Sequence, residues 1–290
     1  VSVVFEREPP PVAATVAHLP APAEPPRMDL GVDGDTALVT ASSSGLGFAS
    51  AAALAAEGAN VVICGRTPGR LDDAAADLDA DSEGGVLAVE TDLTDRADVE
   101  ALVAATVDEF GGIDHLVTSA GGVPPGGFGD VDDEAWYGAY DTLVMSVVWT
   151  LRAARPHLAE SPKGTVTAIT STSVAEPIEN LILSNAVRRG VIGVIKSVAR
   201  DWAPSIRANA VLPGAHETAR IENLIEAGIE RGDYEEYQAG LDDWASAIPL
   251  DRIGDPTGFG QVVAFLASEP ASFVNGVALP VDGGRLPELD

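Results

Sequence analysis

The chain has 290 residues, of which 46% are hydrophobic, which suits one large α/β domain with a sizeable core. Acidic residues outnumber basic ones by 45 to 17, giving a formal net charge of −28. Such a surface repels phosphate backbones, which excludes nucleic acid as a partner. No apolar run approaches the roughly 20 residues of a membrane span, so we expect no membrane partner. The single cysteine, Cys64, excludes an internal disulfide and suits a reducing compartment.

The acidic residues are spread along the helical segments, which disfavours an acidic tail or a cation site, and we predict no metal site. We interpret them as a solvated surface adapted to high salt, where screening relieves self-repulsion. Lys163 and Lys196 are the only lysines, which is typical of proteins from a halophilic cytoplasm. We therefore expect a halophilic, cytoplasmic protein.

Residues 1–28 differ in composition from the rest of the chain. They hold seven of the 20 prolines, at positions 9, 10, 11, 20, 22, 25 and 26. Proline at this density disfavours helix and sheet interiors and favours an extended, solvated chain. We predict a disordered Pro-rich leader over residues 1–28 and one domain over residues 29–290. A docking arm is the alternative interpretation of the leader.

From Asp35 onward, short apolar runs alternate with helical segments. We predict strands over residues 36–40, 60–64, 86–90, 113–118, 165–170, 207–212 and 276–280, and helices over residues 46–57, 68–79, 95–110, 132–157, 179–203, 219–247 and 256–268. Continuous apolar strands joined by helical crossovers are typical of a parallel sheet covered on both faces. The alternation predicts a doubly wound α/β sheet of about seven strands, which binds ligands beyond the carboxyl ends of its strands.

The first strand end holds the most informative segment. A short apolar strand leads into a turn of small residues, Ala41-Ser42-Ser43-Ser44-Gly45-Leu46-Gly47, and an Ala-rich helix follows at once. Gly45 and Gly47 allow backbone to approach a ligand and a helix to approach a strand. Backbone N–H groups at a helix N-terminus, together with the helix dipole, favour a phosphate. This turn therefore predicts a nucleotide-cofactor site.

These elements resemble the short-chain dehydrogenase/reductase family, in particular its 3-oxoacyl-(acyl carrier protein) reductase-like branch, over residues 30–286. The segment Thr40–Gly47 matches the Thr-Gly-x-x-x-Gly-x-Gly loop of that family, with Ala41 in place of the first glycine. Pro213–Thr218 matches the Pro-Gly turn that holds the nicotinamide end of the cofactor. The resemblance implies a single Rossmann-type domain that binds a dinucleotide.

Two further strand ends carry the resemblance. Thr91–Thr94 is similar to the segment that contacts the adenine ring, and Thr118–Gly121 stands where the family has Asn-Asn-Ala-Gly. The resemblance implies cofactor contacts from Ala41, Ser42, Ser43, Ser44, Gly45, Leu46, Gly47, Arg66, Asp92, Leu93, Ser119, Ala120, Gly121, Pro213, Gly214 and Thr218.

The end of the second strand bears on the choice between NADP and NAD. NAD enzymes place a carboxylate there to bind the ribose 2′-hydroxyl, whereas a 2′-phosphate needs a cation. Gly65 occupies the acidic position and Arg66 follows, so its guanidinium could bind the phosphate, and we expect NADP, with NAD as the alternative. The other interpretation of Arg66 is a surface arginine paired with Asp72 or Asp73.

The catalytic positions depart from the family. Its members use a serine, a tyrosine that donates the proton, a lysine four residues later and an asparagine. Here Ser171 matches the serine, but Ser184 and Arg188 stand where the tyrosine and lysine are expected, and Leu143 takes the asparagine position. An aliphatic hydroxyl is a weaker acid than a phenol and arginine keeps its proton, so the site polarises an oxyanion without an efficient proton donor.

Each candidate has a structural alternative. Ser171 could cap the following helix, with Thr172 and Ser173 as competitors for its role. Ser184 and Arg188 could merely line a pocket. His216, in the Pro-Gly turn, is a candidate substitute donor because histidine titrates near neutrality; the alternative is a loop histidine bonded to backbone or water.

We expect an NADP-dependent oxidoreductase acting on a small or acyl-linked carbonyl or alcohol substrate, with a lid insert over about residues 215–248. The lid holds Tyr234 and Tyr237, which either reach the site or lie on the lid surface. The rival hypothesis is a non-catalytic dinucleotide-binding protein, a sensor or an assembly subunit on the same fold.

The resemblance also implies a homotetramer that forms through helices 132–157 and 179–203 and the C-terminal strand. Their apolar faces, with Val144, Val148 and Leu151 on one and Val191 and Ile195 on the other, could form symmetric contacts or pack on the sheet.

Overall fold

The seven strands found among the described residues lie in one parallel sheet, in the order β3-β2-β1-β4-β5-β6-β7. The computed structural model describes residues 28–287; of the predicted leader only Met28 falls in that range. The strands are β1 (Thr36–Val39), β2 (Asn60–Gly65), β3 (Val86–Glu90), β4 (His115–Thr118), β5 (Thr165–Ile169), β6 (Arg207–Pro213) and β7 (Ala278–Val281). The order reverses between β1 and β4, which is the switch point of a doubly wound sheet, and the predicted fold class is confirmed.

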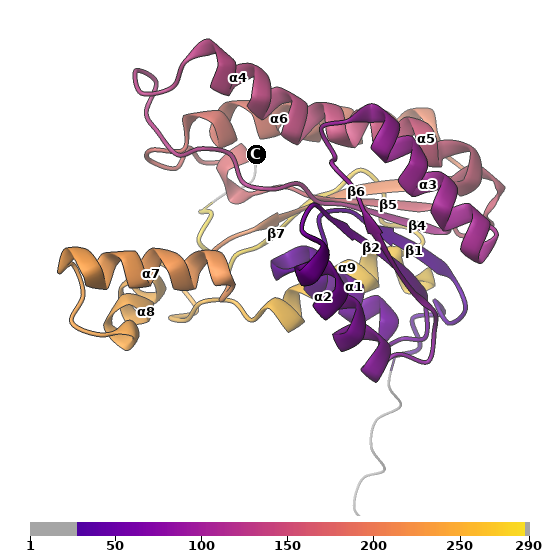
Figure 1. Ribbon diagram of the computed structural model, residues 1–290, viewed down its shortest axis with the longest axis horizontal. Coiled ribbons are helices and arrows are strands. Elements are labelled where there is room, and N and C mark those ends of the chain that lie inside the picture. The colour runs from indigo at the N-terminus through magenta and orange to yellow at the C-terminus, as the bar shows by residue number, and fades with distance from the viewer. Residues whose placement is uncertain (1–27, 288–290) are drawn as a thin grey trace, which may run out of the picture.

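Helices cover both faces of the sheet (Figure 1). One face is covered by α3 (Arg96–Phe110), α5 (Ser146–Glu160) and α6 (Ile182–Asp201), and the other by α1 (Gly45–Ala55), α2 (Pro68–Asp81) and α9 (Pro256–Ala267). Two apolar cores result, one around Leu116 and Leu158 and one around Ile63 and Phe259. Because the sheet is buried on both faces, its strands are continuously apolar, as the sequence indicated.

The segment expected to be one helix over residues 132–157 contains an irregularity. Helix α4 (Asp133–Tyr140) passes through a π-helical turn, η1 (Asp141–Met145), before α5 begins at Ser146. Such a turn inserts one extra residue per turn and is frequent at functional sites. Leu143 lies in this turn and is fully buried.

The apolar residues suggested as contacts between subunits belong mainly to the core of the single chain. Val144, Leu151, Val191 and Ile195 are buried in the core cluster that the sheet shares with these helices, and Val148 is partly buried beside them. Of the two roles considered for these side chains, packing within the chain is therefore the one observed.

The helix expected over residues 219–247 is two helices, α7 (Ala219–Arg231) and α8 (Tyr237–Ser246). Gly232 ends α7 in the left-handed conformation, with φ 82°, which the single-helix prediction overlooked. The pair is held together by the fully buried Ile225 against Gly240, where an added Cβ would lie 2.5 Å from Ile225 Cγ2. Figure 1 shows α7 and α8 standing clear of the sheet, beyond the carboxyl end of β6.

An ionic network ties the amino ends of the strands together. Lys163 Nζ lies 2.9 Å from both oxygens of Asp35 and donates to Gly31 O at 2.7 Å, and His115 Nε2 lies 3.2 Å from Asp35 Oδ2. Burial alone would raise the pKa of Asp35, but hydrogen bonds and charge from His115 and Lys163 outweigh it and lower that pKa. The network fixes the first described residues to the start of β5.

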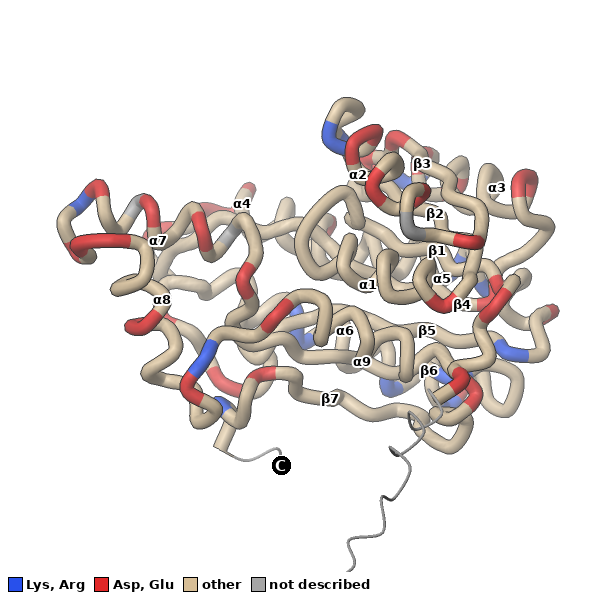
Figure 2. The backbone as a smooth tube through the Cα atoms, turned by 90° about the horizontal axis from the view of Figure 1, so that it is seen from below, with Lys and Arg blue, Asp and Glu red and all other residues tan. Residues whose placement is uncertain are grey.

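Acidic residues are distributed over many elements, including α2, α7 and α8, with few basic residues between them (Figure 2). Within residues 28–287, no helix combines the length and apolarity required to cross a membrane. The same described residues contain no group of three or more His, Cys, Asp or Glu side chains arranged to hold a metal ion.

Candidate active site

The turn between β1 and α1 is tightly folded. Gly45 adopts φ 61°, and Ala41, where the resembling loop has glycine, is also left-handed, with φ 48°. A non-glycine residue in this region costs roughly 1–2 kcal/mol. A Cβ atom on Gly47 would lie 2.5 Å from Ala41 O, so only glycine lets the start of α1 pack this closely on the turn.

The N-terminus of α1 is left open to an anion. Its N-cap, Ser44, makes no side-chain capping hydrogen bond, and the first turn holds no acidic residue. By contrast, Asp95 and Asp132 cap α3 and α4 with their carboxylates. The first N–H groups of a helix need partners, and a phosphate supplies them here without repulsion from a carboxylate. The predicted loop therefore fits the pyrophosphate of a dinucleotide.

Two buried hydroxyls hold this turn against its neighbours. Ser42 Oγ donates to Val39 O at 2.6 Å and accepts from the backbone N–H of Cys64 at 3.1 Å. Thr40 Oγ1 donates to Ser119 O at 2.7 Å and accepts from Ser119 N at 2.9 Å. The second pair joins the ends of β1 and β4, so the Ser119-Ala120-Gly121 segment lies beside the Ala41–Gly47 turn, called here the phosphate loop after its predicted role.

Arg66 and Asp92 lie together at the ends of β2 and β3. Hydrogen bonds from Thr94 lower the pKa of Asp92, and the nearby charge of Arg66 adds to this effect. Among the described residues, no salt bridge joins Arg66 to Asp72 or Asp73, and the Arg66 side chain is exposed. This arrangement disfavours the surface-pair interpretation and leaves the guanidinium accessible to a ligand.

The Pro213–Thr218 turn reaches back to the phosphate loop. A Cβ on Gly45 would lie 3.9 Å from Thr218 Cγ2, and a Cβ on Gly214 would lie 2.8 Å from Asp282 Cβ. A cavity of about 710 Å³ has Gly45 and Thr218 at its wall and continues along the alanine-rich face of α1. The structure thus brings the first and sixth strand ends together at one site.

Ser184 and Arg188 are in contact on α6. Arg188 Nε donates to Ser184 Oγ at 3.2 Å, and Arg188 Nη2 donates to Gly121 O at 3.4 Å. Ser184 is buried, and its Oγ lies 3.1 Å from the Oγ of Ser173, which is itself fully buried. The guanidinium therefore joins α6 to the loop after β4, which stands where the family has Asn-Asn-Ala-Gly.

Ser171 lies two residues after the end of β5 and caps the short 3-10 turn η2 (Thr172–Val174), because its Oγ accepts from Ser173 N at 3.1 Å. The capping alternative for Ser171 is thus observed, and its side chain remains only partly buried. Sequence reasoning assigned the active hydroxyl to Ser171 and named Ser173 only as a competitor. The contact between Ser173 and Ser184 depends on the turn geometry, which the residue spacing does not show.

His216 packs inside the loop. It is buried, its Nδ1 lies 3.2 Å from Gly214 O, and its ring meets Phe259 edge-on at 5.2 Å. Burial lowers the pKa of His216, which keeps the ring neutral at pH 7. This geometry favours the backbone-bonded alternative over a proton donor.

Tyr234 and Tyr237, from the segment of α7 and α8, and Cys64 have other surroundings. Tyr234 donates to Asp243 Oδ2 at 3.0 Å, and partial burial and Asp243 raise its pKa. Burial and the acidic residues around Tyr237, Glu217 first among them, raise the pKa of that phenol as well. Burial raises the pKa of the Cys64 thiol to about 11, so it stays neutral and unreactive.

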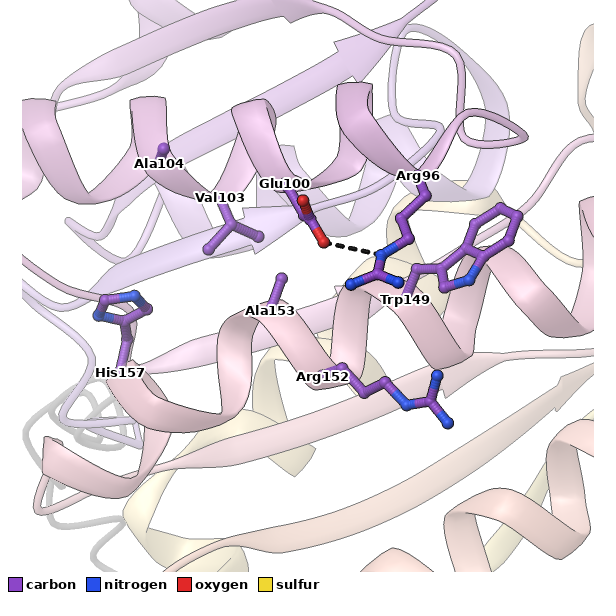
Figure 3. Close-up of a pocket in the computed structure, with 8 residues that line it drawn as sticks. All are labelled: Arg96, Glu100, Val103, Ala104, Trp149, Arg152, Ala153 and His157. Atoms are coloured by element: carbon purple, nitrogen blue, oxygen red, sulfur yellow. Dashed lines mark hydrogen bonds and ion pairs between the residues drawn. The ribbon is translucent and has the colours of Figure 1, made fainter.

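A second hollow, of about 360 Å³, lies on the molecular surface between α3 and α5, away from the strand ends (Figure 3). Arg96 Nε donates to Glu100 Oε1 at 2.8 Å beside Trp149, while Arg152 and His157 lie along α5. All the residues that line this hollow belong to α3 and α5, so it is separate from the candidate active site at the strand ends.

Comparisons with known proteins agree with this geometry. Residues 40–285 match the family described as Enoyl-(Acyl carrier protein) reductase. A 2-keto-3-deoxy-L-fuconate dehydrogenase from Xanthomonas campestris is 33% identical over 257 residues, covering 87% of this chain and 80% of that protein. The chain belongs to the short-chain dehydrogenase/reductase family. As a member of this family, it is an oxidoreductase.

Two solved structures of short-chain dehydrogenases/reductases are similar throughout. L-sorbose reductase from Gluconobacter frateurii, complexed with NADPH and L-sorbose, has a TM-score of 0.87 at 29% identity and covers 90% of this chain and 100% of that one. An NADPH-bound short chain oxidoreductase from Pseudomonas aeruginosa PAO1 is described as containing an atypical catalytic center. Its TM-score is 0.81 at 29% identity, and the match covers 88% of this chain and 98% of that one.

Proposed function

We propose that the protein is an NADP-dependent reductase or dehydrogenase of small carbonyl or alcohol substrates, with altered proton delivery. The observation that carries the proposal is the pair Ser184–Arg188, which reaches Gly121 beside the phosphate loop. Two structural relatives bound to NADPH support the cofactor, and Arg66 supports NADP over NAD. An acyl-linked substrate is the narrower form of the proposal, supported only by the family description.

The chain's own groups suit the two ends of the cofactor. The open N-terminus of α1 would bind the pyrophosphate, and Arg66 would pair with the 2′-phosphate. Pro213, Gly214 and Thr218 would border the nicotinamide, which supplies or takes up a hydride when the cofactor is bound.

The hydroxyls and the guanidinium would act on the substrate oxygen. Ser171 and Ser184 donate hydrogen bonds to the carbonyl oxygen, and Arg188 stabilises the negative charge that grows there during reduction. The alkoxide then takes its proton through the Ser184 hydroxyl, which is replenished from solvent. Serine and arginine do not titrate near neutrality, so the rate of reduction should change little between about pH 6 and pH 9.

The surroundings of the site complete the proposal. Helices α7 and α8, within the lid predicted over residues 215–248, would cover the substrate at the strand ends. We also propose a halophilic cytoplasmic protein. It would assemble as a homotetramer through the helical segments over residues 132–157 and 179–203 and the C-terminal strand β7. Light scattering in molar KCl tests the assembly, and a monomer would contradict it.

The direct test is NADPH oxidation in molar KCl against a panel of ketoses, 2-keto acids, simple ketones and acyl thioesters, with cofactor binding measured by calorimetry. We expect turnover on at least one class of substrate. Tight NADPH binding with no turnover on any class would contradict the reductase and favour the non-catalytic dinucleotide-binding protein.

A further inference from the structure

The hydrogen bonds around Ser184 suggest that a third serine controls the direction of its proton. The Ser173 side chain is fully buried. Within the described part of the chain, its Oγ has Ser184 Oγ as its hydrogen-bond partner, at 3.1 Å. Its backbone N–H is fixed by Ser171 Oγ at the start of η2. A buried hydroxyl without a partner is costly, so this contact holds both side chains in place.

Arg188 fixes the direction of one of the two hydrogen bonds that Ser184 makes. The Nε of Arg188 can only donate, so Ser184 Oγ must accept from it and one of its two lone pairs is used. The contact with Ser173 then has two possible directions, because either hydroxyl can be the donor. If Ser184 donates to Ser173, its only proton is unavailable to a substrate.

A carbonyl substrate decides between the two directions. Its oxygen can only accept, so Ser184 must donate to it, and Ser173 must then donate to Ser184. We propose that Ser173 is a positioning residue that fills the second lone pair of Ser184 and thereby directs the Ser184 proton at the substrate oxygen. The proposal rests on the carbonyl chemistry proposed above. It assigns to Ser173 a function that acts through Ser184 and not through contact with the substrate.

The test is a double-mutant cycle in NADPH-dependent turnover, with kcat and KM measured for the parent, Ser173→Ala, Ser184→Ala and the double variant. We expect Ser173→Ala to lower kcat about 5–10-fold, the effect of one hydrogen bond, with little change in KM or in NADPH affinity. Ser184→Ala should lower kcat about 100-fold. In the Ser184→Ala background, Ser173→Ala should change kcat less than about twofold.

Two further variants separate positioning from a general loss of structure. Ser268 is also a buried serine, but its Oγ donates to Phe265 O away from the site, so Ser268→Ala should leave kcat unchanged. Ser173→Cys keeps a weak donor and should retain more activity than Ser173→Ala. Thermal unfolding of each variant shows which of them remain folded at the assay temperature.

The outcomes are distinguishable. Equal fold-losses from Ser173→Ala in both backgrounds would overturn the positioning role and leave the reductase proposal intact. A loss confined to KM, or Ser173→Cys as slow as Ser173→Ala, would also count against it. A folded, NADPH-binding parent without turnover on any carbonyl would overturn the proposed function, and the positioning role would fall with it.

Discussion

Replacement of Gly47 by alanine should separate cofactor binding from the rest of the fold. The new Cβ would lie 2.5 Å from Ala41 O and 3.1 Å from Ser42 Cα. Both neighbours are backbone atoms, so no side-chain rotation can relieve the contact. Ordinary van der Waals contact begins at 3.4 Å, and the start of α1 must therefore move away from the turn by about 1 Å.

That displacement should affect stability and binding by different amounts. Overpacking of this kind costs about 1–3 kcal/mol of unfolding free energy, which corresponds to a fall in Tm of about 2–10 °C in a chain of this size. The same shift moves the first N–H groups of α1 away from the phosphate. A hydrogen bond to a charged group contributes about 1.5–3 kcal/mol, so we expect the Kd for NADPH to rise at least about tenfold.

Calorimetric titration with NADPH, beside thermal unfolding in molar KCl, measures both effects. The matched control is Gly258→Ala on α9, where a Cβ would meet no atom within 4 Å. Alanine is a better helix former than glycine, so the free energy of unfolding of this variant should rise by up to about 1 kcal/mol. Its Kd for NADPH should be unchanged. An unaltered NADPH affinity in the folded Gly47→Ala variant would refute the placement of the phosphate on this turn.

Four further results are expected. Arg66→Ala should remove most of a preference for NADPH over NADH in calorimetry; equal affinities in the parent would refute the role of the guanidinium. Ser184→Tyr combined with Arg188→Lys should raise kcat on ketones and introduce a pH dependence, with NADPH affinity unchanged; no gain in a folded double variant would contradict the assignment of these positions. Raising KCl from millimolar to molar should increase Tm by at least about 3 °C, roughly 1 kcal/mol, and a constant Tm would show that acidic repulsion does not control stability. The pKa of Asp35 is lowered in the folded state, so the contribution of Asp35 to the free energy of unfolding is present above its unfolded pKa of about 3.9 and is lost as pH falls. In urea unfolding, Asp35→Asn should be less stable than the parent at pH 7, and this difference should shrink at pH 3; equal differences at both pH values would contradict this.

The sequence predicted the parallel sheet, because buried parallel strands have a continuous apolar pattern. It also indicated the edge of the candidate site, because the carboxyl ends of such strands meet at one edge. It did not predict the break at Gly232, since a left-handed C-cap followed by a second helix has nearly the same composition as one continuous helix. The π-helical turn at Asp141–Met145 was equally invisible, because one extra residue in a turn leaves the apolar pattern almost unchanged.

The hydroxyls of the candidate site show a second limit. Spacing selected Ser171 and Ser184 as partners, yet Ser171 caps η2 and Ser173 contacts Ser184. Which of two serines faces α6 depends on the rotation of a three-residue turn, and no periodicity in the sequence encodes that angle. His216 likewise carried a titratable side chain near the expected nicotinamide, but only packing against Phe259 and Gly254 determines that it is buried.

The tie between Lys163, Asp35 and Gly31 has a practical consequence for handling the protein. It fastens the first described residues at the amino ends of the strands, whereas the phosphate loop, Ser184 and the α7–α8 pair lie at the carboxyl ends. An affinity tag or a surface linker joined ahead of Met28 would therefore leave the domain on the side away from the ligand. Immobilised in that orientation, the protein would present its strand-end edge to the solution, which suits biosensor measurements of cofactor binding.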